Sequence, residues 1–406
     1  MQFSENRWLV VAGALIIQIC LGAIYSWSVF VNPLKSVFSF TTTQTQVIFS
    51  LALATFALVM IYAGKLQDRL GPRKVATLGG IVLGSGYLLA SLTGGDFFLI
   101  ALTIGIIGGA GIGFAYVCPI AACVKWFPDK RGMITGIAVA GFGAGAWFFA
   151  KLASHFIDSY GILASFMYLG FIFMASVVIG AQLLRNPPEG WKPAGWNPPA
   201  SGSAAFLATG STTDYKWQEM IRHKQFWMLW IMFVCGAIAG LLVIGILKPY
   251  GLYSGLSATA AANAVGVLAL FNGAGRIIWG MVSDKIGRKN AMTLLFLLQG
   301  VMMLVLSEMG SSEITLSIAA AWVGFNFGGN LALFRTTAAD YFGTKNVGIN
   351  YALLFTAYGV AGIAGPILAG SVFDMTGSYI WAFIPSGAAC LIAAGVSLGL
   401  RSPSRN

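Results

Sequence analysis

Charged residues are scarce in this sequence. Asp, Glu, Lys and Arg make up only 9% of the 406 residues, whereas 57% are hydrophobic and the mean hydropathy is +0.80. Soluble globular domains carry about a quarter charged residues. The shortage of charge excludes a soluble domain and predicts an all-α integral membrane protein.

Residues that build disulfides, metal centres and acid–base sites are also few. The sequence has five cysteines, all within apolar stretches and without Cys-x-x-Cys spacing, and only two histidines. This pattern excludes a disulfide framework and indicates no metal site. We therefore expect no cofactor.

The net charge of +11 raises the question of nucleic-acid binding. However, the basic residues occur in short groups between apolar stretches, and they do not form one basic face. A nucleic-acid partner is therefore not indicated.

Long apolar stretches recur along the whole chain, and their length is sufficient to span a bilayer. The first begins soon after the N-terminus and is too long for a signal-peptide core, so we expect it to be retained as a helix. The pattern predicts twelve membrane helices, at about 8–31, 46–64, 75–94, 97–123, 132–155, 163–184, 225–247, 259–281, 290–307, 314–338, 347–372 and 379–400.

The basic residues predict the orientation of these helices. If both termini are cytoplasmic, nearly all Lys and Arg residues fall on the cytoplasmic side, and only Lys35, Lys151 and Lys248 lie outside. We expect a multi-pass protein of the cytoplasmic (inner) membrane, surrounded by lipid, and we expect a monomer.

A proline-rich segment divides the chain into two parts. Residues 186–213 are rich in Pro, Ser, Gly and Ala and predict an irregular linker, and residues 215–224 predict an amphipathic helix at the membrane interface. The predicted organisation is an N-terminal six-helix bundle at 1–185, a cytoplasmic linker at 186–223 and a C-terminal six-helix bundle at 224–406.

The two bundles repeat with one constant offset. A shift of 216 residues carries Pro33, Gly64, Asp68, Gly71 and Asp158 onto identical residues, without any gap; these are Pro249, Gly280, Asp284, Gly287 and Asp374. Repeats of this kind build transporters with a substrate path between two bundles.

Arg276 is the one basic residue deep inside a predicted span. It lies eight residues before Asp284, where the span ends, which is roughly 12 Å at helical rise and near the bilayer midplane. A buried arginine costs about 2.5–3.5 kcal/mol, so it should face a cavity and meet an anion. No Asp or Glu lies at that depth in the other predicted spans. We therefore expect the anion to be a small carboxylate substrate and expect no enzymatic activity.

Two loops share a motif. Residues 64–74 (GKLQDRLGPRK) and 280–289 (GMVSDKIGRK) resemble the loop signature of the major facilitator superfamily. The resemblance implies gating roles for Asp68 with Arg69 and for Asp284 with Lys285. The two carboxylates would face the positive N-terminal ends of helices eleven and five and hold the bundles together. A plain solvated turn is the alternative.

Further segments point to a narrower group. Residues 186–193 (NPPEGWKP) and 271–276 (FNGAGR) are similar to the oxalate/formate antiporter family, and residues 126–132 (WFPDKRG) resemble the monocarboxylate porters, the animal lactate and pyruvate carriers. In both groups the eighth-helix arginine binds the substrate carboxylate. The resemblance implies this role for Arg276.

This chain departs from these families at several positions, and the departures narrow the choice of substrate. The oxalate antiporter has a helix-eleven lysine where this chain has Tyr358, so only one cation is expected at the site. A second carboxylate would be uncompensated, which favours a monocarboxylate. The porters' proton-coupling aspartate and lysine correspond to Asn272 and Val29. Asn272, four residues before Arg276 on the same face, can hydrogen-bond a hydroxyl or keto oxygen, and its alternative is an interhelical bond.

The resemblance to the oxalate antiporter also implies an aromatic wall around the substrate. For each of these residues, ordinary helix packing is the alternative. The matching residues are Tyr25, Tyr116, Phe142, Phe327, Phe355 and Tyr358. Arg335 and Asp340, near the inner end of helix ten, are expected to form a local pair or gate contact and not a site.

The prediction is a proton-coupled secondary transporter of small monocarboxylates, lactate- or pyruvate-like, that works by alternating access around Arg276. Two alternatives stay open. One is an exchanger of oxalate and formate, and the other is a membrane receptor that binds a carboxylate without moving it.

Overall fold

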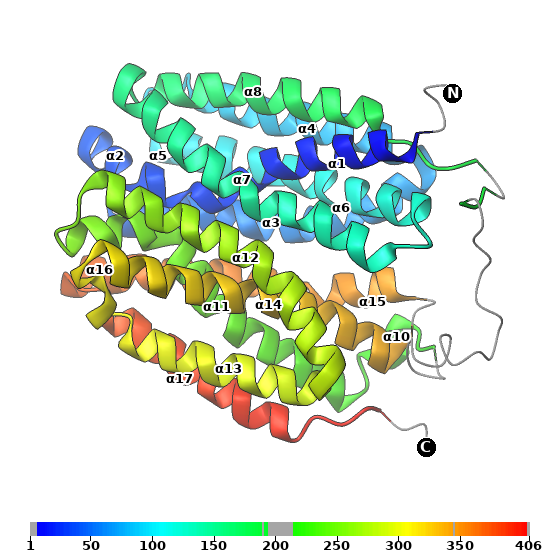
Figure 1. Cartoon of the computed structure of the whole chain (residues 1–406). Coiled ribbons are helices and arrows are strands. Elements are labelled where there is room, and N and C mark those ends of the chain that lie inside the picture. The colour runs from blue at the N-terminus through cyan, green and yellow to red at the C-terminus, as the bar shows by residue number, and fades with distance from the viewer. Residues whose placement is uncertain (1–5, 189–190, 194–213, 344–345, 404–406) are drawn as a thin grey trace.

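Helices account for the secondary structure in the described part of the chain (Figure 1). The structure is a computed structural model and describes residues 6–188, 191–193, 214–343 and 346–403. The first half contains α1 (Arg7–Gly22), η1 (Ala23–Ser26), α2 (Ser28–Phe38), α3 (Thr42–Leu70), α4 (Pro72–Ala90), α5 (Phe97–Ile100), η2 (Ala101–Gly108), α6 (Gly109–Trp126), α7 (Arg131–Tyr160) and α8 (Ile162–Leu183).

The second half follows the linker. It contains α10 (Trp217–Met220), α11 (Lys224–Tyr253), α12 (Ala258–Ile286), α13 (Arg288–Val305), η3 (Glu308–Ser311), α14 (Glu313–Phe342), α15 (Val347–Leu354), α16 (Thr356–Thr376) and α17 (Ile380–Leu398). Apart from the short α10 and η3, these elements form twelve helical segments, six in each half, as the apolar pattern predicts. The first half has α1–η1–α2, α3, α4, α5–η2–α6, α7 and α8, and the second half has α11, α12, α13, α14, α15–α16 and α17. Several helices are longer than the predicted spans because they continue past the membrane into charged residues, as α3 does from Lys65 to Leu70.

The repeat extends to the helix bounds. A shift of 216 residues carries both ends of α3 onto those of α12, and it carries the start of α5 and the end of α6 onto the two ends of α14. The ends of α7 fall on the start of α15 and the end of α16. The motif loops match as well, because Gly71 and Gly287 both take a positive φ (83° and 85°) that favours glycine.

The described helices suit a lipid environment. Nine of them are long and apolar enough to cross a membrane. Large apolar side chains also face outward, including Phe171, Ile179 and Trp381, each more than half exposed. In water such side chains would be costly, whereas in a bilayer they face hydrocarbon.

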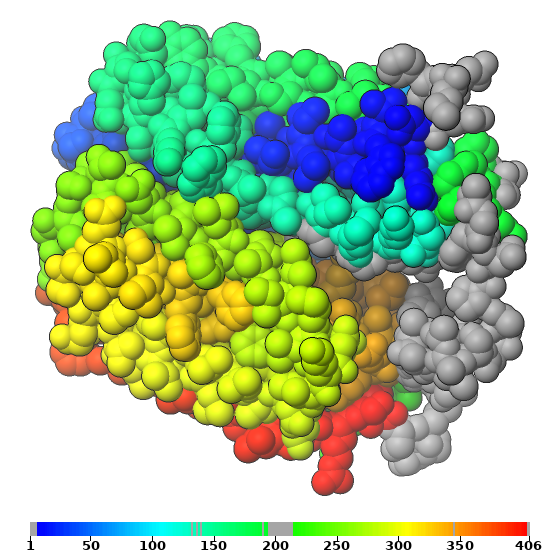
Figure 2. Space-filling view, in the orientation of Figure 1, coloured from blue at the N-terminus to red at the C-terminus, as the bar shows by residue number. Residues whose placement is uncertain are grey.

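The two halves lie side by side (Figures 1 and 2). In Figure 1 the helices before residue 185 occupy the upper part and those after residue 224 the lower part. Both termini lie at the right in this view, and we call this the linker end; the opposite end is the far end. Most of the predicted linker, at 189–190 and 194–213, lies outside the described residues.

The predicted amphipathic helix at 215–224 is shorter than expected. Only Trp217–Met220 is helical, and α11 begins at Lys224. The chain is held instead by Tyr215, whose N–H donates to the Phe342 carbonyl and whose carbonyl accepts from the amide of Asn350. These bonds attach the segment to the second half and prevent a longer helix.

The two halves are joined at the far end. Asp374 of α16 accepts the backbone N–H groups of Thr42 and Thr43, at the start of α3, at 2.9 and 2.6 Å. The side-chain amide of Gln46 also donates to the Gly245 carbonyl across the halves, at 3.1 Å. A carboxylate at a helix N-terminus is favoured by free N–H groups and by the helix dipole. The far end is therefore latched shut.

Three helical segments change their winding. The fourth passes through the π-helix η2 at Ala101–Gly108, away from the residues that line the cavity described next. The first helical segment passes through the 3-10 turn η1 at Ala23–Ser26, and the eleventh is divided between α15 and α16 at Phe355. These last two interruptions lie beside the cavity, where Tyr25 and Tyr358 meet. Local departures from α geometry of this kind often mark functional positions.

Candidate functional site

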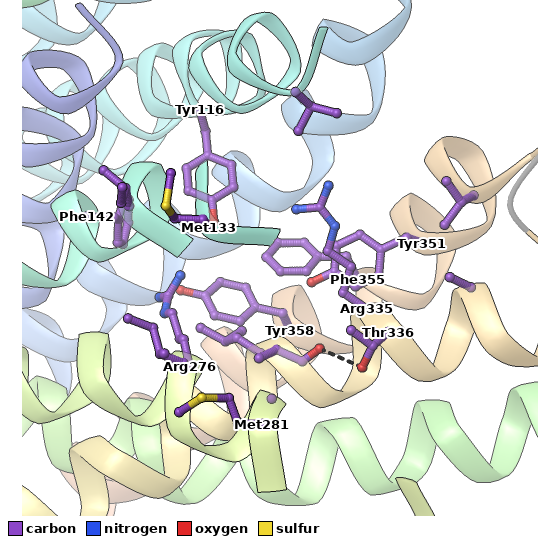
Figure 3. A pocket seen from close by; sticks show the side chains of 18 of the residues that line it. Tyr116, Met133, Phe142, Arg276, Met281, Arg335, Thr336, Tyr351, Phe355 and Tyr358 are labelled. Atoms are coloured by element: carbon purple, nitrogen blue, oxygen red, sulfur yellow. Dashed lines mark hydrogen bonds between the residues drawn. The ribbon is translucent and has the colours of Figure 1, made fainter. Parts of the chain in front are cut away.

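A cavity of about 740 Å³ lies between the two halves (Figure 3). It is lined from the level of Arg276 down to residues at the linker end, such as Asp284, Ala339 and Val347. The far end is latched, so this structure has a cavity that extends toward one end only. Its walls are predominantly apolar, as is typical of sites for small molecules.

Arg276 of α12 lies at the inner part of this cavity. Its side chain is 9% exposed, and its Nε donates to Oδ1 of Asn272 at 3.1 Å. Among the described residues it forms no ion pair with an Asp or Glu; the ion pairs found there are Arg7–Asp129, Arg288–Asp284 and Arg288–Asp340. The guanidinium lines the cavity and is available to an anion.

Asn272 lies one turn before Arg276 and is fully buried. It is not among the residues that line the cavity, and its Nδ2 has no hydrogen-bond partner. In this conformation Asn272 therefore orients Arg276. Its Oδ1 accepts from Nε, and the other two guanidinium nitrogens remain for other partners.

Aromatic rings from the first half form one wall. Tyr25, Tyr116 and Phe142 all line the cavity. The Phe142 ring meets Tyr25 edge-on at 5.1 Å and Tyr116 edge-on at 5.3 Å between centroids. Edge-to-face contacts of this kind hold rings in fixed positions. The wall is thus both apolar and ordered.

Aromatic rings from α15 and α16 form the opposite wall. Phe355 and Tyr358 stack at 4.7 Å with their planes 14° apart. The hydroxyl of Tyr358 hydrogen-bonds that of Tyr25 at 2.9 Å, so a buried polar contact joins the halves beside Arg276. In Figure 3, Tyr116 and Phe142 of the first half and Phe355 and Tyr358 of the second half surround one space.

Phe327 of α14 lies behind this wall. Its ring is 2% exposed and meets Tyr25 at 5.9 Å, but it is not a cavity-lining residue. Among the aromatic residues expected around a substrate, the structure thus brings five to the cavity surface and places Phe327 one layer further out.

The motif loops lie at the linker end. Asp68 and Arg69 are exposed, as is Lys285, and Asp284 lines the cavity with a side chain that is 65% exposed. Asp284 accepts from Arg288 at 2.5 Å. In this structure the linker end is open, and the predicted contact of these carboxylates with the opposite bundle stays a prediction about the closed state.

The expected pair between Arg335 and Asp340 is wrong. Asp340 accepts from Arg288 of α13 at 2.7 Å, whereas Arg335 lines the cavity. The reason is helical geometry, because a separation of five residues places two side chains about 140° apart around α14. Burial acts to lower the pKa of Arg288, but the hydrogen bonds and charges of Asp340 and Asp284 outweigh it and raise that pKa.

The cavity residues that sequence reasoning missed include two aromatic side chains with a detectable signal and one cation without it. Phe56 is related to Asn272 by the 216-residue shift. Tyr351 precedes Phe355 by four residues and Tyr358 by seven, which is the spacing of one helix face. Arg335 faces the cavity because Asp340 pairs with Arg288. The sequence alone does not show whether Asp340 pairs with Arg288 or with Arg335.

The arrangement can bind one small anion. A single buried guanidinium in an apolar cavity can hold a carboxylate through two parallel hydrogen bonds. The described cavity residues include no cysteine, histidine or serine. The geometry therefore suits binding and release.

Comparisons with known proteins agree with this geometry. The family model of the Major Facilitator Superfamily matches residues 14–280 and 242–406. The chain is 31% identical to an uncharacterised MFS-type transporter, YhjX, of Escherichia coli (strain K12), over 89% of this chain and 87% of that protein.

Two further relatives have more informative names. The chain is 32% identical to an oxalate:formate antiporter of Oxalobacter formigenes, over 89% of this chain and 83% of that protein. It is 26% identical to monocarboxylate transporter 2 of Rattus norvegicus, over 96% of this chain and 82% of that protein.

A solved structure supports the fold independently. A bacterial homologue of the human lysosomal transporter Spinster, in an inward-facing and unoccupied conformation, superposes with a TM-score of 0.67. It shares 16% identity and covers 98% of this chain and 96% of its own, so the likeness concerns the fold alone. Together with the family match, these findings show that the chain is a multi-pass membrane transporter of the major facilitator superfamily.

Proposed function

We propose that this protein is a secondary active transporter of small monocarboxylates such as L-lactate and pyruvate, coupled to a proton. The observation that carries the proposal is Arg276, a buried cation without a carboxylate partner among the described residues, in a cavity between the two halves. Such a charge is costly until an anion neutralises it.

The apolar surroundings of Arg276 favour a substrate with one charge. Tyr358 stands where a second cation would be needed to compensate a dianion close to Arg276, and the Phe142 and Phe355 rings leave an apolar surface for a methyl group. The names of the relatives, an oxalate:formate antiporter and a monocarboxylate transporter, point to the same chemical class.

The proposed mechanism is alternating access. The cavity opens toward the linker end, and Asp374 latches the far end, so the two ends differ as the two faces of a carrier must. Binding of the carboxylate removes the unpaired charge and lets the halves close over the site. Asp68 and Asp284 then hold the linker end shut. Arg276 takes the ionised carboxylate, and the coupled proton crosses in the same step, so anion and proton together move no net charge.

We further propose a location and an assembly. The excess of basic residues at the linker end supports a cytoplasmic position for that end, with both termini, in a protein of the inner membrane. The two bundles (1–185 and 224–406) and the linker (186–223) form one monomeric carrier.

The test uses purified protein in liposomes and labelled L-lactate. Arg276→Ala should abolish uptake, because it removes the binding charge, and uptake by the wild type should rise with an inward pH gradient. Arg401→Ala, which removes an exposed arginine outside the cavity, is the matched control. Size-exclusion profiles and thermal unfolding check that both variants fold. Uptake by Arg276→Ala at the wild-type rate would refute the proposal.

Exchange of oxalate and formate is the second candidate. It is favoured by the 32% identity to the antiporter of Oxalobacter formigenes. Liposomes loaded with unlabelled oxalate distinguish the two, because an exchanger takes up labelled formate faster when oxalate is inside. A lactate carrier shows no such stimulation.

A further inference from the structure

A second cation faces the cavity. Arg335 of α14 lines it together with Arg276, and its guanidinium lies over the ring of Tyr351, 5.9 Å from the centroid. This distance is at the outer limit of a cation–π contact. Figure 3 shows Arg335 beside Tyr351 and Phe355, on the side of the cavity away from Arg276.

Arg335 has no carboxylate partner in the described ranges. Asp340, the nearest acid along α14, is bonded to Arg288, and Asp284, which also lines the cavity, is bonded to the same arginine. Arg288 therefore binds both acids, so neither of them pairs with Arg335, although one guanidinium offsets only one of their two negative charges. The positive charge of Arg335 stays uncompensated and exposed to the cavity.

The two cations lie at different depths. Asn272 and Gly328 are at the same level, because a Cβ on Gly328 would collide with the Asn272 carbonyl. Arg276 lies four residues beyond Asn272, and Arg335 lies seven residues beyond Gly328, in both cases toward the linker end. The difference of three residues corresponds to roughly 4–5 Å along the helices. Arg335 is thus nearer to the cavity mouth.

An aromatic surface connects the two levels. Tyr351, Phe355 and Tyr358 share one face of the eleventh helical segment, with Tyr358 beside Arg276 and Tyr351 beside Arg335. The rings lie 5.7 and 4.7 Å apart in succession. A small carboxylate with an apolar tail can move along this surface while its charge passes from one guanidinium to the other.

From this arrangement, and on the basis of the proposed transport of small carboxylates, we propose that Arg335 and Tyr351 form a second anion-binding station at the cavity mouth. The station takes the carboxylate between the solution at the linker end and Arg276. It concentrates anions at the mouth and speeds their arrival, because an uncompensated charge in a low-dielectric cleft raises association rates.

The first experiment measures binding alone, so it is valid whether or not the protein transports lactate. In the Arg276→Gln background, saturation-transfer NMR of the lactate methyl group should detect residual weak binding, on the order of 1 mM or weaker. Adding Arg335→Gln should abolish this signal, and adding Lys74→Gln should not. Lys74 is an exposed cation of α4 outside the cavity. Residual binding that survives Arg335→Gln overturns the second station.

The second experiment measures rates with the primary site intact. Stopped-flow fluorescence with lactate should show association slowed roughly tenfold in Arg335→Gln at low salt, with the difference shrinking at high salt. Arg335→Lys keeps the charge and should retain most of the rate, which also excludes a folding defect as the cause. An unchanged association rate in Arg335→Gln contradicts the station. An equilibrium loss equal to that of Arg276→Gln also contradicts it, because Arg335 would then belong to the primary site.

Discussion

The two halves of the chain share their helix bounds but differ in the chemistry they present to the cavity. At equivalent positions, 216 residues apart, the first half has Met60 where the second has Arg276, and Phe56 where the second has Asn272. Phe142 of the first half corresponds to Tyr358. The repeat thus supplies a symmetric frame, and a few substitutions in the second half supply the charge and the polar groups.

This asymmetry assigns different tasks to the halves. In the proposed mechanism the second half holds the anion through Arg276, and the first half contributes Tyr25, Tyr116 and Phe142 to an apolar aromatic wall. Among the described cavity residues, the Tyr25 hydroxyl makes the hydrogen bond from the first half to the opposite wall. A substrate is therefore bound to one half and covered by the other.

The largest effect is expected when the two halves are made identical at the position of Arg276. Arg276→Met places in the second half the residue of the first, and it removes the charge-assisted bonds to the carboxylate. We expect a loss of about 3 kcal/mol, or roughly 100-fold in lactate affinity, measured by calorimetry. An affinity within threefold of the wild type would argue against the asymmetric assignment.

The next prediction changes the orienting residue. Asn272→Asp places a carboxylate beside Arg276 and compensates its charge, so lactate binding near pH 7 should fall by roughly tenfold. Protonation of the new acid removes the competing charge, so binding should recover as the pH is lowered. Asn272→Leu removes the acceptor without adding a charge, and its binding should be weakened to the same extent at every pH.

A third prediction compares equivalent acids at the far end. Asp374 caps α3 across the halves, whereas its equivalent Asp158 is exposed. Asp374→Ala should weaken the latch by about 1–2 kcal/mol and shift the carrier roughly tenfold toward opening at the far end. Asp158→Ala should shift it much less.

Pulsed electron-spin distance measurements check this comparison. Labels at Val37 and Met375, exposed at the far ends of α2 and α16, report the separation of the halves once the five native cysteines are replaced. Longer distances in Asp374→Ala than in Asp158→Ala are expected. Equal distributions in the two variants would remove the evidence for a latch.

The smallest effect is expected at the tyrosine pair. Tyr358→Phe makes the position identical to Phe142 and removes the 2.9 Å bond to Tyr25, while the stacking on Phe355 is retained. The loss of one neutral hydrogen bond is worth about 1 kcal/mol, or a severalfold change in the concentration of lactate that half-saturates uptake. A change as large as that of Arg276→Met would mean that the hydroxyl contacts the substrate directly.

The sequence was sufficient to predict the helical framework and the depth of Arg276. Twelve helical segments follow from the lengths of the apolar stretches, the repeat follows from one offset, and the depth of Arg276 follows from its distance to Asp284. These features depend on short-range periodicity and on the high cost of a charge in hydrocarbon. Both are visible in a single chain.

Features that depend on packing between helices were harder to predict. Arg335 was expected to pair with Asp340, but that acid belongs to Arg288 on a neighbouring helix. Asn272 was expected to face the substrate, and in this structure it accepts from Arg276 instead. In each case two partners were sterically available, and the choice between them is made by helix rotation and tilt, which residue spacing does not encode.

The lone guanidinium has a consequence for the response of the carrier to membrane voltage. An empty site carries the full charge of Arg276, and a site that holds the carboxylate anion together with the coupled proton carries the same charge, because anion and proton cancel. A potential of 100 mV acts on one elementary charge with about 2.3 kcal/mol when it crosses the whole field. The loaded and the empty carrier should therefore both respond to voltage, while a complete cycle of proton-coupled transport moves no net charge. A cytoplasm at negative potential should hold the unloaded protein with its site facing inward.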